Sequence, residues 1–198
     1  MTQHPLPPRL ADLKRQLLRG RAQRIHPAGL EGDDLPGVEL GRVHEILPAH
    51  PGEAAAMGFV LCLLAGAGGG DTRPLMWITT HAARREVGRL YAPGIIGAGL
   101  DPGRLIQVIA PSDREALWVM EQALRSGALA GVAGEAGKVA FTPSRRLSLA
   151  ASSAGTPLFL LRPWDMTGTS AAATRWRVGP RLCYLRPVSR ARTGHRVF

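Results

Sequence analysis

Residues 43–54 read Val43-His44-Glu45-Ile46-Leu47-Pro48-Ala49-His50-Pro51-Gly52-Glu53-Ala54, a strand-like apolar segment followed by a turn. A helix-like apolar segment, Met57 to Leu64, comes directly after that turn. A strand, a glycine-bearing turn and a helix in this order form the framework of a phosphate-binding loop, whose consensus is G-x-x-x-x-G-K-[ST]. The framework therefore predicts a fold of the nucleotide-hydrolase type.

The chemistry of such a loop is missing from this segment. Gly52 keeps the second glycine, whereas Leu47 replaces the first, Glu53 the lysine and Ala54 the hydroxyl residue. In a working loop the lysine neutralises the β- and γ-phosphates and the hydroxyl holds magnesium. An anionic Glu53 would repel a triphosphate, so we predict a degenerate nucleotide loop in a protein that acts through contacts and is not an enzyme.

Strand-like and helix-like segments alternate on both sides of the loop, which predicts an α/β fold with a mainly parallel sheet flanked by helices. We expect strands near 43–47, 74–80, 104–109, 129–134 and 157–161. We expect helices near 53–65, 82–91, 112–127 and 142–153. Ser112 is the expected N-cap of the third helix, which ends at Gly127, and Trp118 within it is expected to pack in the core.

The two ends of the chain differ from this middle part. Leu10, Leu13, Leu17 and Leu18 recur at helical spacing and predict an amphipathic helix over 8–23 that docks on a partner. A glycine- and proline-rich loop over 27–41 follows it. Strands at 174–178 and 182–185 are expected to form a short antiparallel extension turning at Gly179-Pro180. We thus predict a basic helix and linker in 1–40, a core domain in 41–178 and a basic tail in 179–198.

The formal net charge of +10 belongs to these ends. Residues 1–24 carry six Lys or Arg against one acid, and residues 162–198 carry eight Arg against Asp165. Such ends can neutralise nucleic-acid phosphates, dock on an acidic protein, or form a solvated face, and the sequence leaves the three open. The candidate contacts for nucleic acid or an acidic partner are Arg145, Arg146, Arg175, Arg177, Arg190, Arg192 and Arg196.

Composition excludes several other classes of protein. The two cysteines, Cys62 and Cys183, stand alone, so we expect neither a metal site nor a disulfide. The amino-terminal residues lack the pattern of a signal peptide, and no stretch reaches the roughly 20 apolar residues that span a bilayer. We expect a cytoplasmic protein with no membrane contact.

Five runs in the middle of the chain resemble the RecA-type core, and specifically the ImuA family. These are LYAPG (90–94), AGLDPGRLI (98–106), DREALWVMEQALRSGALA (113–130), SRRL (144–147) and LAA (149–151). The family comprises RecA-related accessory proteins of bacterial inducible mutagenesis, often described as SulA-like inhibitors of cell division. The resemblance covers about residues 40 to 178. It implies a RecA-like core.

The resemblance also implies roles for single residues. Thr80 falls where the ATPases keep the glutamate that activates water, and Glu135 stands near the position of the aspartate that orders magnesium. It further implies a non-catalytic protein without a cofactor, acting in damage-inducible translesion synthesis. The implied partners are a Y-family polymerase-like protein lacking polymerase activity and an error-prone C-family DNA polymerase, with RecA and single-stranded DNA as further candidates.

Two alternatives stay open at this point. One is a residual nucleotide-binding switch built on Gly52, His50 and Glu135. The other is a SulA-like inhibitor of cell division that binds the division GTPase.

Overall fold

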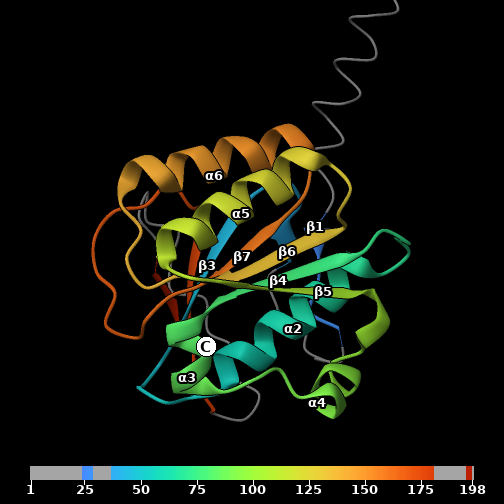
Figure 1. The fold of residues 1–198 in the computed structure, drawn as a ribbon, viewed down its shortest axis with the longest axis horizontal. Helices are drawn as coiled ribbons and strands as arrows, with labels where there is room; N and C mark the ends of the chain where they lie inside the picture. Colours follow the sequence, from blue (N-terminus) through green and yellow to red (C-terminus); the bar gives the residue numbers. More distant parts are fainter. Residues whose placement is uncertain (1–23, 29–36, 181–194, 198) are drawn as a thin grey trace, which may run out of the picture.

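A parallel seven-stranded sheet forms the centre of the molecule (Figure 1). The computed structural model describes residues 24–28, 37–180 and 195–197. Within them the strand order is β5-β4-β6-β7-β3-β8-β9, and each neighbouring pair runs in the same direction. The strands are β3 (Val43–Pro48), β4 (Leu75–Thr80), β5 (Leu105–Ala110), β6 (Gly131–Glu135), β7 (Leu158–Leu161), β8 (Thr174–Val178) and β9 (His195–Val197). The predicted α/β fold with a parallel sheet is confirmed.

Helices cover both faces of the sheet. Figure 1 shows α5 and α6 side by side over one face, and α2, α3 and α4 over the other. The helices are α2 (Ala55–Gly68), α3 (His81–Val87), α4 (Ala92–Gly97), α5 (Asp113–Ser126) and α6 (Phe141–Ala154), with a 3-10 turn η1 (Pro102–Arg104) before β5. No described helix has the length and apolar character needed to cross a bilayer.

Each face of the sheet has its own apolar core. On one side α2 buries nine of its residues against Trp77, Phe159 and Trp176 of the sheet. On the other side α5 and α6 bury apolar side chains such as Met120 and Leu147. Such burial stabilises the fold by roughly 25 cal/mol per Å² of apolar surface removed from water. Because α2 is buried on most of its surface, it is apolar on nearly all sides.

Local signals set the helix boundaries. Ser112 is the N-cap of α5 and Gly127 ends it in the left-handed conformation, as predicted. The helix expected over 82–91 ends earlier, at Val87, because Gly88 follows with a φ of +90°, and the separate short helix α4, which was not predicted, begins at Ala92.

The carboxyl-terminal extension differs from the prediction. We expected an antiparallel pairing for 174–178, but β8 lies parallel to β3, and β9 lies parallel to β8. Twelve residues, 162–173, separate β7 from β8. This connection is long enough to bring the chain back to the end of the sheet where the parallel strands begin. Ala173 N there donates to Val43 O over 2.8 Å. The second expected strand, 182–185, lies outside the described residues.

A small sheet precedes the core where a loop was predicted. The strands β1 (Arg24–Ile25) and β2 (Val38–Glu39) pair antiparallel. The segment after β1 rests on α2, because Ala28 N donates to Cys62 O over 2.9 Å. A Cβ atom at Gly66 would lie 2.1 Å from the carbonyl oxygen of His26, so this close approach requires glycine. The predicted amino-terminal helix lies outside the described residues.

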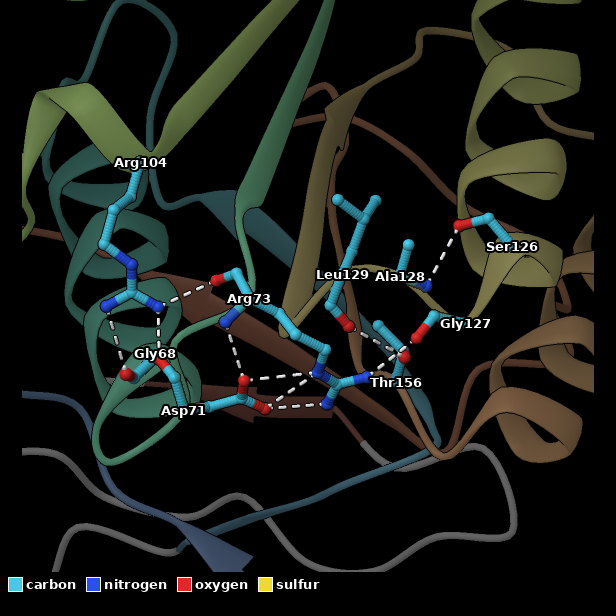
Figure 2. Close-up of polar contacts among 9 residues, drawn as sticks. All are labelled: Gly68, Asp71, Arg73, Arg104, Ser126, Gly127, Ala128, Leu129 and Thr156. Carbon is cyan, nitrogen blue, oxygen red and sulfur yellow. Dashed lines mark hydrogen bonds and ion pairs between the residues drawn. The ribbon is translucent and has the colours of Figure 1, made fainter.

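The loops that enter the sheet are tied together by a network that Figure 2 shows, which we call the amino-end network (Asp71, Arg73 and Arg104). Arg104 Nη2 donates to Arg73 O over 2.8 Å and also to Asp71 O, while its Nη1 lies 3.4 Å from Gly68 O. Arg73 pairs with Asp71 at 2.7 Å and reaches Gly127 O at 2.9 Å. The Arg73 guanidinium lowers the pKa of Asp71. This edge of the sheet is closed by internal bonds.

Candidate functional site: a phosphate-loop framework that binds its own carboxylate

The degenerate loop connects β3 to α2 and holds a carboxylate of its own. Glu53 Oε2 accepts hydrogen bonds from Ala49 N at 3.1 Å and from His50 N at 3.2 Å. Gly52 turns the chain with a φ of +78°, which an L-residue adopts only with strain. Two backbone donors of the kind that cradle a phosphate therefore already have an anionic partner.

The neighbouring positions complete this arrangement. Ala54 is the N-cap of α2 and makes no side-chain capping bond, so Glu53 supplies the negative charge that the positive end of the helix favours. Leu47 is buried within β3 and lies outside the turn. Glu53 thus binds two amides of its own loop and places a negative charge there.

A cavity of about 540 Å³ opens beside this loop, at the carboxyl ends of the strands. Open parallel sheets bind ligands at this edge. Gly52, Glu53, Ala54 and Glu135 all line the cavity, so the structure brings four of the five predicted loop residues together, without Leu47. Four acidic residues contribute to its wall: Glu53, Glu86, Asp113 and Glu135.

Two predicted positions in the cavity make internal contacts. Burial raises the pKa of Glu135, whose Oε1 accepts a 2.9 Å hydrogen bond from Trp77 Nε1, a bond that partly offsets the rise. Thr80 Oγ1 accepts from Ala83 N at 3.1 Å and caps α3. Both side chains therefore serve the packing of the cavity wall. The described residues contain no group of three or more His, Cys, Asp or Glu that could hold a metal ion.

A buried ion cluster lies beneath the cavity. Glu45 of β3, fully buried, binds Arg175 of β8 at 2.7 Å and lies 3.9 Å from Arg162 Nε. Arg162 lines the cavity yet is only 4% exposed. Burial lowers the pKa of this guanidinium, and Glu45 partly restores it. Glu45 thus binds Arg175 directly and lies near the charge of Arg162, which follows β7, without a hydrogen bond between Arg162 Nε and Glu45 Oε1.

Comparison with known proteins gives a shared fold and a homologue. The crystal structure of SulA from Pseudomonas aeruginosa superposes with a TM-score of 0.50 at 20% identity, covering 61% of this chain and 97% of that one. Protein ImuA from two strains of Caulobacter vibrioides, NA1000 / CB15N and ATCC 19089 / CIP 103742 / CB 15, is 32% identical over 157 residues, or 73% of this chain. The chain is a homologue of ImuA.

The coverage and the sequence identity of these matches limit what they show about this chain. The chain spans 62% of the length of the ImuA relatives. At 20% identity the likeness to SulA shows a shared fold alone. No family model matches the chain.

In this ImuA homologue the predicted contact residues fall into four groups. Arg175 is bound to Glu45, and Arg177 donates to Trp164 O at 2.7 Å. Arg145 and Arg146 are exposed on α6, where Arg146 binds Glu121 at 2.5 Å. Arg190, Arg192 and the leucines Leu10, Leu13, Leu17 and Leu18 lie outside the described residues. Arg196 falls in β9, of which only the backbone is described.

Sequence reasoning missed two surface features. Trp118, expected in the core, is 59% exposed. The helical spacing could have predicted this exposure. Ala116, Met120 and Leu124 define the buried face of α5, and Trp118 lies on the opposite side of the helix. A basic surface cluster also surrounds α3, where His81, Arg84, Arg85 and Arg89 line a shallow depression.

Proposed function

We propose that this ImuA homologue is a non-catalytic, RecA-like accessory protein of damage-inducible translesion synthesis. The observation that carries the proposal is the Glu53 carboxylate, bonded to the loop amides at Ala49 and His50. A protein with this loop acts by binding other macromolecules in the cytoplasm. The likeness to ImuA supports the mutagenesis context.

The loss of the lysine supports a role without nucleotide. A charge-assisted hydrogen bond to phosphate is worth about 1.5–3 kcal/mol, and replacing it by a carboxylate adds repulsion. The cavity beside the loop offers a triphosphate four acidic side chains and the partly neutralised Arg162. The framework supports the packing of α2 on the sheet without requiring a ligand.

The partners in this proposal are a Y-family polymerase-like protein that lacks polymerase activity and an error-prone C-family DNA polymerase. RecA and single-stranded DNA are further candidates. The basic ends of the chain supply charge for such contacts. If they bind single-stranded DNA, affinity falls with salt at a log-log slope of about −0.7 per phosphate contacted.

Co-purification tests the proposal. The full chain is expressed with the Y-family polymerase-like protein of the same bacterium, with and without residues 1–24, and the stoichiometry is measured by light scattering. A stable complex with the full chain is expected. If the folded chain binds neither polymerase partner but retains the division GTPase in a pull-down, the mutagenesis role is wrong and the division-inhibitor alternative replaces it.

A further inference from the structure

We propose that the outer face of α5 and α6 is a docking surface for an acidic partner segment that carries apolar side chains. This outer face consists of Arg114, Trp118 and Arg125 on α5, with Arg145, Arg146 and Leu149 on α6. The inference rests on the proposed function and names the surface through which the protein binds a polymerase partner.

Two large apolar side chains stand exposed on this face. Trp118 is 59% exposed and Leu149 is 62% exposed. Neither side chain packs on the sheet, because the buried face of α5 contains Ala116, Met120 and Leu124, and that of α6 contains Leu147, Ala150 and Ala151. Exposed Trp in a basic setting is typical of an interface anchor, since Trp and Arg are enriched among binding hot spots.

A buried glutamate joins the two helices and orders the arginines beside these anchors. Glu121 is 4% exposed and binds Arg125 Nη2 of its own helix at 2.8 Å. The same carboxylate binds Arg146 Nη2 of α6 at 2.5 Å. The seam between α5 and α6 therefore carries two guanidinium groups held in place by one buried acid.

Helical spacing places the anchors along this seam. Trp118 lies one turn before Glu121 on α5, and Leu149 lies one turn after Arg146 on α6. Residues three or four apart share one side of a helix. Arg114 is one turn before Trp118, and Arg145 one turn before Leu149. The face thus presents two apolar anchors, each with an arginine one turn away.

The charge of the face favours an acidic partner. Of the four arginines on this face, Arg125 and Arg146 bind the buried carboxylate of Glu121, and Glu115 is bonded to Ser112 at the start of α5. A single-stranded nucleic acid would use a row of aromatic rings as a stacking platform. Trp118 of α5 and Phe141 at the start of α6, 50% exposed, are two separate rings, and the aliphatic Leu149 suits an apolar side chain better than a base. An acidic protein segment therefore fits the face better than DNA.

The test compares two matched double variants of the full chain. Trp118→Ala/Arg145→Glu alters the proposed face, and Tyr91→Ala/Arg89→Glu makes the same changes between α3 and α4, on the opposite side of the sheet (Figure 1). Both tyrosine and tryptophan are exposed, at 73% and 59%. Binding to the Y-family polymerase-like protein is measured by calorimetry, with circular dichroism as the folding check.

The face variant is expected to bind at least about thirtyfold more weakly, the loss typical of a hot-spot residue, and the control within about twofold of wild type. Leu149→Ala alone provides a second, milder loss that does not depend on charge reversal. Wild-type affinity in the face variant would overturn the docking surface alone. Absence of binding by the wild-type chain would overturn the proposed function and this surface together. Weaker binding of labelled dT30 with unchanged partner affinity would assign the face to DNA and overturn the proposal.

Discussion

The two edges of the sheet differ in how they use polar groups. At the edge where strands begin, Arg104 donates to the carbonyl groups of the loops, and Asp71 and Arg73 bind each other. At the edge where strands end, a mainly apolar cavity of about 540 Å³ has four acids in its wall, and Glu53 binds the loop amides. The first edge is closed by bonds among structural groups, whereas the second keeps the shape of a ligand site with groups that repel its expected ligand.

Under the proposed function, this difference shows how a loop with a phosphate-binding framework is held in place without a nucleotide. The loop amides of Ala49 and His50 need an anionic or polar partner whether or not phosphate is bound. Glu53 supplies that partner within the chain. The framework can thus persist as scaffold, and binding function can move to outer surfaces such as the α5 and α6 face.

The largest effect is expected beneath the cavity. Glu45→Ala leaves Arg175 of β8 and the neighbouring Arg162, which follows β7, without the carboxylate between them. Removing one partner of a buried ion pair costs about 3–5 kcal/mol. Urea unfolding should show this loss in the free energy of unfolding. A loss below about 1 kcal/mol would mean that the cluster is solvated and that the cavity floor is not structural.

His44, in the amino half of β3, should make the free energy of unfolding depend on pH. Burial lowers the pKa of His44 from 6.5 to about 4, and its ring bonds to Thr174 Oγ1 at 2.8 Å and Glu39 O at 2.9 Å. The unfolded chain therefore binds the extra proton between pH 6.5 and 4, so stability falls as pH falls through this window. The loss amounts to about 3 kcal/mol.

Urea unfolding at pH 7 and pH 4.5 measures this dependence for wild type and His44→Gln. The variant should lose most of the acid sensitivity that the histidine contributes. An identical pH profile in the two proteins would show that His44 is not held neutral in the fold.

A somewhat smaller effect is expected in the amino-end network. Arg104→Ala removes the donors to the carbonyl groups of Asp71 and Arg73 and should lower the free energy of unfolding by about 2–3 kcal/mol. Arg114→Ala on exposed α5 is the matched control and should change it by less than about 0.5 kcal/mol. Equal effects of the two variants would remove the contrast between the edges.

The smallest effect is expected in the loop itself. Glu53→Ala frees the amides of Ala49 and His50, which are near solvent, and should cost about 1 kcal/mol, as loss of a helix cap does. Glu86→Ala, another acid of the cavity wall, is the control and should be neutral within about 0.5 kcal/mol. Denaturant midpoints of the two variants decide between these outcomes. A neutral Glu53→Ala would mean that the carboxylate does not hold the loop.

The sequence predicted most of the fold because its signals are local. Apolar strands, the cap at Ser112 and the stop at Gly127 all appear in the structure. The direction of β8 was missed because it depends on the path of residues 162–173, and the Gly179-Pro180 pair suggested a hairpin. The parallel pairing of β8 with β3 depends on tertiary packing, and the local sequence does not determine it.

The candidate site was predicted in part. The substitution of Glu53 for lysine was visible in the sequence, and Glu135 does reach the same cavity. The bonds from Glu53 back to its own loop depend on the turn at Gly52, and the pairing of Glu45 with Arg175 depends on strand register. Such contacts join residues that are adjacent only after folding.

Calorimetric titration of magnesium-ATP into the full chain tests most directly whether this loop binds the Glu53 carboxylate in place of a nucleotide. We predict no saturable binding tighter than about 1 mM for wild type. Saturable binding at about 10 μM, lost when Gly52 is replaced by a bulky residue, would contradict the account and restore the nucleotide-switch alternative.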